Sequence, residues 1–496
     1  MMSRQSNHRH ERYGDGERDV GGNPVLTLLG FGMVITFMAL IMTKRLSPMV
    51  ALILIPVLFA LVGGFGGPKL GEMMIDGVKT LAPTGVMLMF AILYFGVMID
   101  AGLFDPVVRR ILAVVDGDPL KVVIGTAVLA AFVSLDGDGS TTYMIVCASM
   151  LPLYRRLGMN ALNLTCVAIL AGGVMNLTPW GGPLARAASA LQIDPSAIFV
   201  PMIPTMVVGV IGVIALAWHL GLAERRRLGV LALQPAYAFG SLSSAATSGA
   251  ALREAMRSDA SPDGLANDGL MEESALLPAE NGEAEALRRP KLLWVNALLT
   301  IALMAGLIMA VLPLPILFMI GFALALVINY PKVDEQRRRV AEHAKNVIAV
   351  VSLIFAAGVF TGILGGTGMV DAMSKSFLAI IPDAWGPYLA PITAIASMPF
   401  TFFISNDAFY YGVLPVVSEA AGHYGIGQLE MARASLMGQP VHLLSPLVPS
   451  TYLLVGLAGV EFGDHQKFTL KWAVAICLLM TATAMATGIF PLVSMT

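Results

Sequence analysis

The chain has 496 residues, of which 56% are apolar and only 13% charged, with a formal net charge of −2. Globular proteins carry about a quarter charged residues, so this composition argues against a soluble domain and indicates a polytopic membrane protein. The near-zero net charge gives no overall attraction to nucleic acid, and no such partner is expected. Cys147, Cys166 and Cys477 lie in apolar stretches and form no disulfide or metal pattern.

The first 23 residues are polar and predict an N-terminal tail, and no cleavable signal peptide is visible. Apolar segments of spanning or near-spanning length follow at 24–42, 47–63, 82–102, 120–134, 142–153, 161–180, 198–220, 291–311, 313–329, 346–365, 376–403, 409–418, 434–459 and 470–492. Several are too short to cross a bilayer alone. The segments 120–134 and 142–153 flank a polar break, as do 376–403 and 409–418, and we expect each pair to form a re-entrant hairpin.

Residues 224–290 differ from the rest of the chain. Between Leu228 and Leu287 there are nine acidic and two basic residues, with Ser, Ala and Gly repeats and no apolar period. Such a composition predicts a flexible cytoplasmic linker. The linker would divide the chain into transmembrane repeat 1, residues 24–223, and transmembrane repeat 2, residues 291–496.

The two halves repeat at an offset that stays near 265–269 positions. The matched segments are Phe90–Phe95 with Phe355–Phe360, Gly102–Asp105 with Gly368–Asp371, Asp138 with Asp407, and Thr178–Pro179 with Ser445–Pro446. Chance similarity between apolar helices is the alternative, but it would rarely preserve one offset over this length. We therefore predict an internal repeat.

Charge bias predicts the orientation of the halves, because cytoplasmic loops collect Lys and Arg. If Lys44 and Arg45 face the cytoplasm, counting crossings places there also Arg109–Arg110, Arg155–Arg156, Arg225–Arg227, Arg288–Arg289 and Arg337–Arg339. The equivalent loops of the other half, 312–315 and 419–430, are uncharged or acidic. We predict an all-α fold of two inverted-topology repeats, with about ten transmembrane helices and two re-entrant hairpins in the inner membrane. Both termini would lie on the outer side of that membrane.

Four polar breaks interrupt the apolar segments. The first carries Asp136, Gly137, Asp138, Gly139, Ser140 and Thr141. Carboxylates at membrane depth are costly and usually mark ion or proton pathways, and the glycines free the backbone carbonyls to face a ligand. The motif resembles the start of an EF-hand loop, but Thr141 and Cys147 stand where that loop requires glycine and glutamate, so we reject this interpretation. A surface turn between two helices is the alternative.

The remaining breaks combine short polar side chains with prolines. Ser405, Asn406 and Asp407 form the second, which on its own would most often be a helix N-cap. The third runs from Asn176 to Pro183 and the fourth from His442 to Pro449. Proline frees carbonyls within a spanning helix, and hydroxyls redirect or satisfy them. The alternative is a proline kink with satisfied caps and, for His442, a packed histidine.

Long contiguous stretches of the chain resemble a known protein family. They are 44–48, 60–66, 82–87, 94–105, 135–142, 176–183, 405–415 and 438–452. They closely resemble the bacterial citrate–divalent-metal:proton symporter family, over most of the chain outside the tail and the linker. The resemblance implies an ion-transporter superfamily fold, in which two hairpin tips and two broken helices enclose the substrate. Related sodium-coupled dicarboxylate carriers have Ser-Asn-Thr at each tip, and this chain departs from that pattern.

Charge favours a metal complex as the substrate. A citrate trianion carries about three negative charges, and the three acidic residues of the tips would repel it while the arginine clusters lie at loop ends. Chelation of Mg²⁺ or Ca²⁺ lowers that charge, and tip oxygens complete the shell of the cation. A carboxylate that must be neutral beside an anion carries a proton with it.

We therefore predict a secondary transporter that imports citrate with Mg²⁺ or Ca²⁺, coupled to protons, with no permanently bound cofactor. The expected partner besides the substrate is the lipid bilayer. A homodimer is a further possibility that we consider. A sodium-coupled di- or tricarboxylate carrier of free substrate is the alternative. A channel is disfavoured by the closed hairpins. An enzyme is not expected, because no nucleotide loop, metalloprotease helix or nucleophile elbow is present.

The candidate residues fall into three groups. Substrate binding is predicted for Ser140, Thr141, Thr178, Ser405, Asn406, His442 and Ser445. Proton or metal coupling is predicted for Asp136, Asp138 and Asp407. The breaks themselves are predicted to depend on Gly137, Gly139, Asn176, Pro179 and Pro446.

Overall fold

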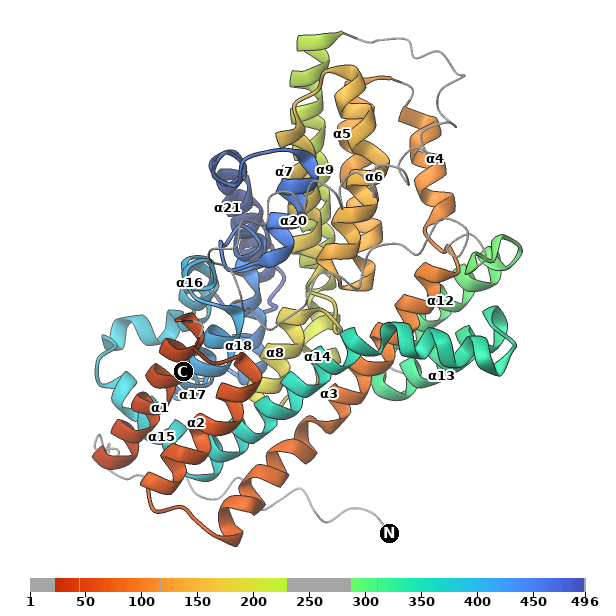
Figure 1. Ribbon diagram of the computed structural model, residues 1–496. Coiled ribbons are helices and arrows are strands. Elements are labelled where there is room, and N and C mark those ends of the chain that lie inside the picture. The colour runs from red at the N-terminus through yellow and green to blue at the C-terminus, as the bar shows by residue number, and fades with distance from the viewer. Residues whose placement is uncertain (1–22, 44, 116, 230–286, 310, 495–496) are drawn as a thin grey trace, which may run out of the picture.

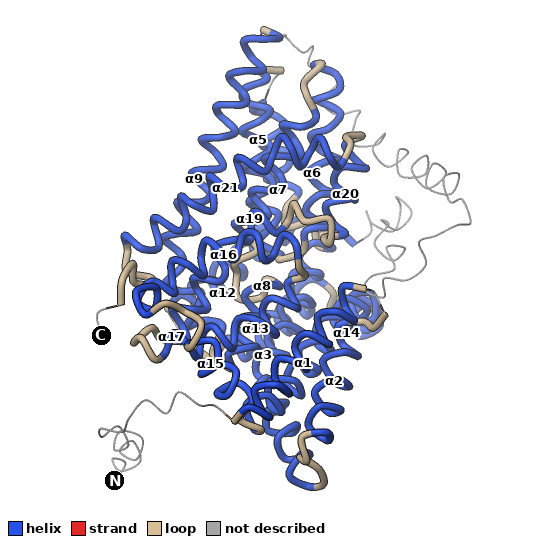
Figure 2. The backbone as a smooth tube through the Cα atoms, turned by 90° about the vertical axis from the view of Figure 1, so that its left-hand side faces the viewer, coloured by secondary structure: helices blue, strands red, loops and turns tan. Residues whose placement is uncertain are grey.

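The computed structural model in Figure 1 describes residues 23–43, 45–115, 117–229, 287–309 and 311–494. Over this part of the chain the structure is nearly all helical and has no strand (Figure 2). The predicted N-terminal tail up to residue 22, Lys44 and residues 230–286 of the predicted linker lie outside the described residues.

The first half folds into nine α-helices and a short 3-10 turn. They are α1 (Pro24–Met42), α2 (Pro48–Val62), α3 (Pro68–Asp100), α4 (Asp105–Val115), α5 (Pro119–Val133), η1 (Ser134–Asp136), α6 (Gly139–Leu157), α7 (Ala161–Met175), α8 (Gly182–Leu191) and α9 (Pro195–Leu228). Five of these helices start at a proline, which suits the first turn because its N–H has no partner there. Side chains of Asn23 and Asp118 accept backbone N–H groups where α1 and α5 begin.

The second half repeats the same order of elements. They are η4 (Pro290–Leu292), α12 (Leu293–Ile308), α13 (Leu314–Asn329), α14 (Val333–Gly366), α15 (Met369–Leu378), η5 (Asp383–Tyr388), α16 (Leu389–Phe403), the π-helical η6 (Ala408–Val413), α17 (Leu414–Gly422), α18 (Gln428–Ser435), η7 (Leu436–Gly438), α19 (Gln439–His442), α20 (Pro449–Ala458) and α21 (Phe462–Ala486). Both halves run through two helices, one long helix, a short helix, a hairpin, a broken helix and a final helix. This order supports the internal repeat, while the opposite membrane orientation of the halves stays a prediction.

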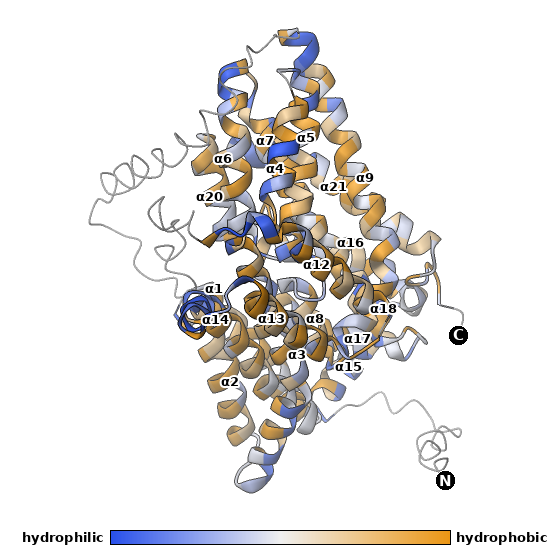
Figure 3. Ribbon diagram, turned by 90° about the vertical axis from the view of Figure 1, so that its right-hand side faces the viewer, coloured by the Kyte–Doolittle hydropathy of each residue, from blue (hydrophilic) through white to orange (hydrophobic). Residues whose placement is uncertain are grey.

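Among the described residues, seven helices are long and apolar enough to cross a membrane, and further apolar helices are shorter. Figure 3 shows hydrophobic residues along much of the length of these helices and hydrophilic residues at the end of α9. The prediction of an all-α, multi-pass membrane protein is confirmed.

Several predicted boundaries were wrong. The single segment 376–403 is divided into α15, η5 and α16, with Pro382 and Pro387 in the interruption. Helices α3 and α14 begin well before the predicted 82 and 346, because their first turns are helical but charged. Helix α9 continues to Leu228, so it covers the first residues assigned to the linker. Helix α8 was not predicted as a separate element.

The long helices α3 and α14 contact each other through glycine. A Cβ on Gly77 would lie 2.0 Å from the carbonyl oxygen of Gly358, and one on Gly362 would lie 2.3 Å from that of Met73. Small residues let membrane helices approach closely enough for backbone packing. The two helices lie side by side in Figure 1 and form the centre of one part of the molecule.

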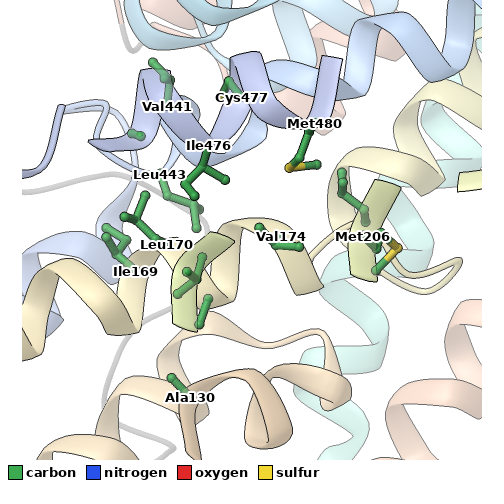
Figure 4. Packing of buried hydrophobic residues seen from close by; sticks show 14 of the residues in the cluster. Ala130, Ile169, Leu170, Val174, Met206, Val441, Leu443, Ile476, Cys477 and Met480 are labelled. Carbon is green, nitrogen blue, oxygen red and sulfur yellow. The ribbon is translucent and has the colours of Figure 1, made fainter. Parts of the chain in front are cut away.

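Buried apolar residues form two large cores. One is built mainly by α5–α7, α9 and α16–α21, and the other by α1–α3 and α12–α15. Figure 4 shows residues of α7, such as Leu170 and Val174, facing Leu443 and Ile476 of the second half. Helix α8 lies between the two cores, because Leu184 and Leu191 belong to the first core and Ala185 and Ala190 to the second.

Candidate functional site

The first polar break is the tip of hairpin 1, which is formed by α5, η1 and α6. Gly137 has a φ of +82°, which an L side chain rarely adopts, and a Cβ there would lie 3.0 Å from Cδ1 of Trp180. Nε1 of Trp180 donates to the carbonyl oxygen of Leu135 at 2.8 Å. The tip of hairpin 1 is therefore held against the third break.

The two carboxylates of this tip have different surroundings. Asp138 is the N-cap of α6: its oxygens accept N–H bonds from Ser140 at 3.0 Å and Thr141 at 3.1 Å, and the hydroxyl of Thr141 at 2.5 Å. Oδ1 of Asp136 accepts the N–H of Asp138 at 2.9 Å, but its buried Oδ2 has no hydrogen-bond partner among the residues that the structure describes. Within the described residues, neither carboxylate has an ion-pair partner. Asp136 thus has the uncommitted oxygen.

The second break forms the tip of hairpin 2, between α16 and η6. Ser405 Oγ accepts the N–H of Ala408 at 3.2 Å, and the Asn406 amide exchanges hydrogen bonds of 3.4 and 3.3 Å with Gln439. Oδ1 of Asp407 lies 2.5 Å from Nε of Arg186, which donates to it. Gln439, which sequence analysis did not single out, therefore joins this tip to α19.

Arg186 corrects the expectation that no basic residue offsets the acidic residues of the tips, which was based on the arginine clusters at loop ends. It lies on α8, shortly after the third break, and forms an ion pair with Asp407 in which the two side chains are 23% and 8% exposed. Tyr410 and Tyr411 lie within electrostatic reach of it. The only sequence signal was an isolated arginine in an Ala-rich stretch beside a proline break, and a charged residue at membrane depth is a functional candidate.

The third break is a tight backbone turn. The N–H of Asn176 bonds to the carbonyl of Gly172 at 2.8 Å at the end of α7, and Pro179 lies within the turn. A Cβ on Gly181 would lie 2.1 Å from the carbonyl oxygen of Asn176. The Thr178 hydroxyl is buried and has no hydrogen-bond partner in the described part of the chain. It is therefore a polar group available to a ligand or a water molecule.

The fourth break attaches to the second hairpin. Nδ1 of His442 donates to the Thr401 carbonyl at 2.6 Å. Ser445 Oγ donates a hydrogen bond to the carbonyl oxygen of Phe402 at 2.7 Å. The carbonyl oxygen of Pro446 accepts the hydroxyl of Tyr452 at 3.1 Å. His442 and Ser445 therefore position the arm of α16, and His442 also lies within electrostatic reach of Arg186 and Asp407.

All four breaks meet in one region. A Cβ on Gly139 of the first tip would lie 3.4 Å from Oγ of Ser450, the residue after the fourth break. One on Gly173, just before the third break, would lie 2.8 Å from Cα of Pro440, just before the fourth. The predicted convergence of the polar breaks is thus present in the structure. In the described part of the chain, however, no three His, Cys, Asp or Glu side chains gather as a metal centre. Asp136, Asp138 and Asp407 do not surround one ion position.

A separate apolar groove of about 530 Å³ lies between α16 and α21 and is lined by residues such as Ile395, Phe402 and Leu470. Its lining is apolar, so we do not place a charged substrate there. The polar region where the four breaks meet is the candidate site. It offers a guanidinium, several hydroxyls and the free oxygen of Asp136, which suit an anion that carries hard cations.

Comparison with known proteins gives consistent matches. The model of the citrate transporter family matches residues 37–438. The chain is 57% identical to a citrate transporter of Bacillus subtilis (strain 168) and 51% identical to a Mg(2+)/citrate complex secondary transporter of that organism, each over 94% of this chain and 99% of the relative. The solved YdaH transporter of Alcanivorax borkumensis has a TM-score of 0.47 and 14% identity over 85% of this chain and 88% of its own, too distant to inform the site.

Proposed function

The chain belongs to the citrate transporter family, and from this membership we propose that it imports citrate as a complex with Mg²⁺ or Ca²⁺, coupled to protons. At the coarser level it is a multi-pass membrane protein of secondary citrate transport and not an enzyme. The relative named for the Mg(2+)/citrate complex supports the metal as part of the cargo.

One observation supports a metal–citrate complex as the substrate. Asp407 is balanced by Arg186, but Asp136 and Asp138 have no ion-pair partner among the described residues. A citrate trianion next to two carboxylates that no described basic side chain balances would be repelled in surroundings of low dielectric constant. Chelation of a divalent cation removes most of that charge and presents a hard cation to oxygen ligands. We assign the metal side of the complex to the tip of hairpin 1.

Proton coupling is assigned to the same tip. Oδ2 of Asp136 is buried, and no described residue forms a hydrogen bond with it. An unpaired charge at such a position is costly, and a proton that arrives with the substrate would remove it. The hydroxyls of Ser140, Thr178 and Ser405 are proposed to contact the substrate.

A sodium-coupled carrier of free di- or tricarboxylate is the second candidate. Arg186 favours it, because a guanidinium in the site offsets part of the charge of an uncomplexed anion. The two candidates differ in which concentration controls the rate. A metal-citrate carrier responds to the complex, whereas the second carrier responds to free citrate and sodium.

The test is uptake of labelled citrate into proteoliposomes under an imposed proton gradient. Mg²⁺ or Ca²⁺ is titrated at fixed citrate, and the rate is expected to rise and then saturate. Excess EDTA should abolish uptake while the gradient persists. Uptake that continues in EDTA and requires sodium would support the second candidate instead.

A further inference from the structure

We propose that Arg186 binds a carboxylate group of the substrate through the terminal edge of its guanidinium, and that Asp407 is a positioning residue that holds the guanidinium by Nε. The inference rests on the proposed citrate transport and names the residue that would recognise the anion. It does not depend on whether the citrate carries a metal ion.

The geometry leaves the terminal nitrogens uncommitted. Among the described residues, the hydrogen bond of the Arg186 side chain is the one from Nε to Oδ1 of Asp407, at 2.5 Å. A guanidinium has five N–H donors in a planar fork, and its Nη1 and Nη2 edge matches the two oxygens of a carboxylate. With Asp407 at Nε, that edge remains available to a second carboxylate. The Arg186 side chain also retains 23% exposure, against 8% for Asp407.

The position of the guanidinium fits this role. A Cβ on Gly182 would lie 2.8 Å from Nη1, so Nη1 lies beside the third break. Asp407 belongs to the tip of hairpin 2, and His442 of the fourth break lies within electrostatic reach. Arg186 thus stands where three of the four breaks meet. Glycine at 182 leaves room for the guanidinium, because a Cβ there would overlap Nη1.

A purely structural ion pair is the competing explanation. A buried pair that only neutralises Asp407 could be replaced by neutral residues, because removing both charges leaves none unpaired. A residue that binds the substrate cannot be rescued in this way. The double variant R186Q/D407N therefore separates the two explanations.

The experiment measures the KM and kcat of citrate uptake in proteoliposomes for the wild type, R186K, R186Q, R186Q/D407N and the exposed control R226K. R186K keeps the charge but loses the fork, and we expect its KM to rise about tenfold or more with a smaller change in kcat. R186Q should lose uptake, and R186Q/D407N should remain defective although it is as stable as the wild type in detergent. R226K should behave like the wild type.

Ligand specificity gives a second measurement. The wild type should prefer citrate over an analogue in which a methyl group replaces one carboxylate, and the preference should shrink at least about tenfold in R186K. Recovery of uptake in R186Q/D407N, or an unchanged KM and preference in R186K, would overturn the inference while the proposed function stands. A wild-type protein that shows no citrate counterflow would overturn both.

Discussion

Nε1 of Trp180 donates a hydrogen bond to the carbonyl oxygen of Leu135 at 2.8 Å. The bond joins the break that follows α7 to the tip of hairpin 1. The indole also packs against Phe95 and Phe318, with ring centroids 5.3 and 5.2 Å away. Trp180 therefore connects the hairpin tip to the core around α3 and α13.

Replacement of Trp180 by phenylalanine keeps an aromatic ring in this contact but removes the donor. We expect W180F to lose about 1 kcal/mol of stability and to transport more slowly, because the Leu135 carbonyl loses its partner. Thermal unfolding in detergent and initial uptake rates test this. The control is W218F, since Trp218 is 53% exposed. Equal effects of the two changes would show that the hydrogen bond does not hold the tip.

Asp136 is expected to be required for transport. Asn in its place keeps the shape but removes the ionisable oxygen, and we expect D136N to reduce uptake by about tenfold or more, which corresponds to 1.4 kcal/mol. The amount of folded protein in the membrane should not change, because no ion pair is lost. D76N is the matched control, as the Asp76 side chain is 72% exposed. Near-normal uptake by D136N would remove Asp136 from the coupling mechanism.

The contact between α3 and α14 should tolerate no side chain at Gly77. A Cβ there would lie 2.0 Å from the Gly358 carbonyl oxygen, whereas one on Gly71 of the same helix would have nothing within 4 Å. We expect G77A to destabilise the protein by about 1–3 kcal/mol through overpacking, and G71A to be neutral or slightly stabilising. Thermal unfolding of both variants measures the difference. Equal stability would mean that the helices separate at little cost.

The opposite orientation of the two halves predicts which loops are outside the cell. Arg155 lies in the last turn of α6 and His423 directly follows α17, the equivalent hairpin helix, and both residues are exposed. Cysteine at position 423 should react with a membrane-impermeant maleimide in intact cells, and cysteine at position 155 only in inverted vesicles. The native cysteines are buried, which keeps the background low. Labelling of both positions from one side would refute the inverted repeat.

Much of the site was accessible from sequence because membrane helices leave a strong pattern. Polar interruptions such as Asp136–Thr141 and Ser405–Asp407 stand out within apolar segments, since lipid offers their backbone no partner. The repeated offset between the halves then paired the breaks with each other. The structure brings these breaks together, as expected.

The difference between the carboxylates was not accessible. Asp138 and Asp407 occupy equivalent positions in the repeat, yet one caps α6 and the other pairs with Arg186. A cap depends on the local backbone turn, and the ion pair depends on a partner 221 positions away. Neither leaves a periodic signal, so the repeat suggested an equivalence that the environments do not share.

The class of protein, the helical segments and the polar breaks could be predicted from the amino-acid sequence, because each follows from local hydropathy and backbone chemistry. Which groups remain free to bind depends on how the helices pack. Packing of α8 between the two cores brings Arg186 to Asp407. The hydrogen bonds of the first tip satisfy Asp138, while Oδ2 of Asp136 has no hydrogen-bond partner within the described residues. Partners in three dimensions, and not residue type, determine which buried charges are compensated.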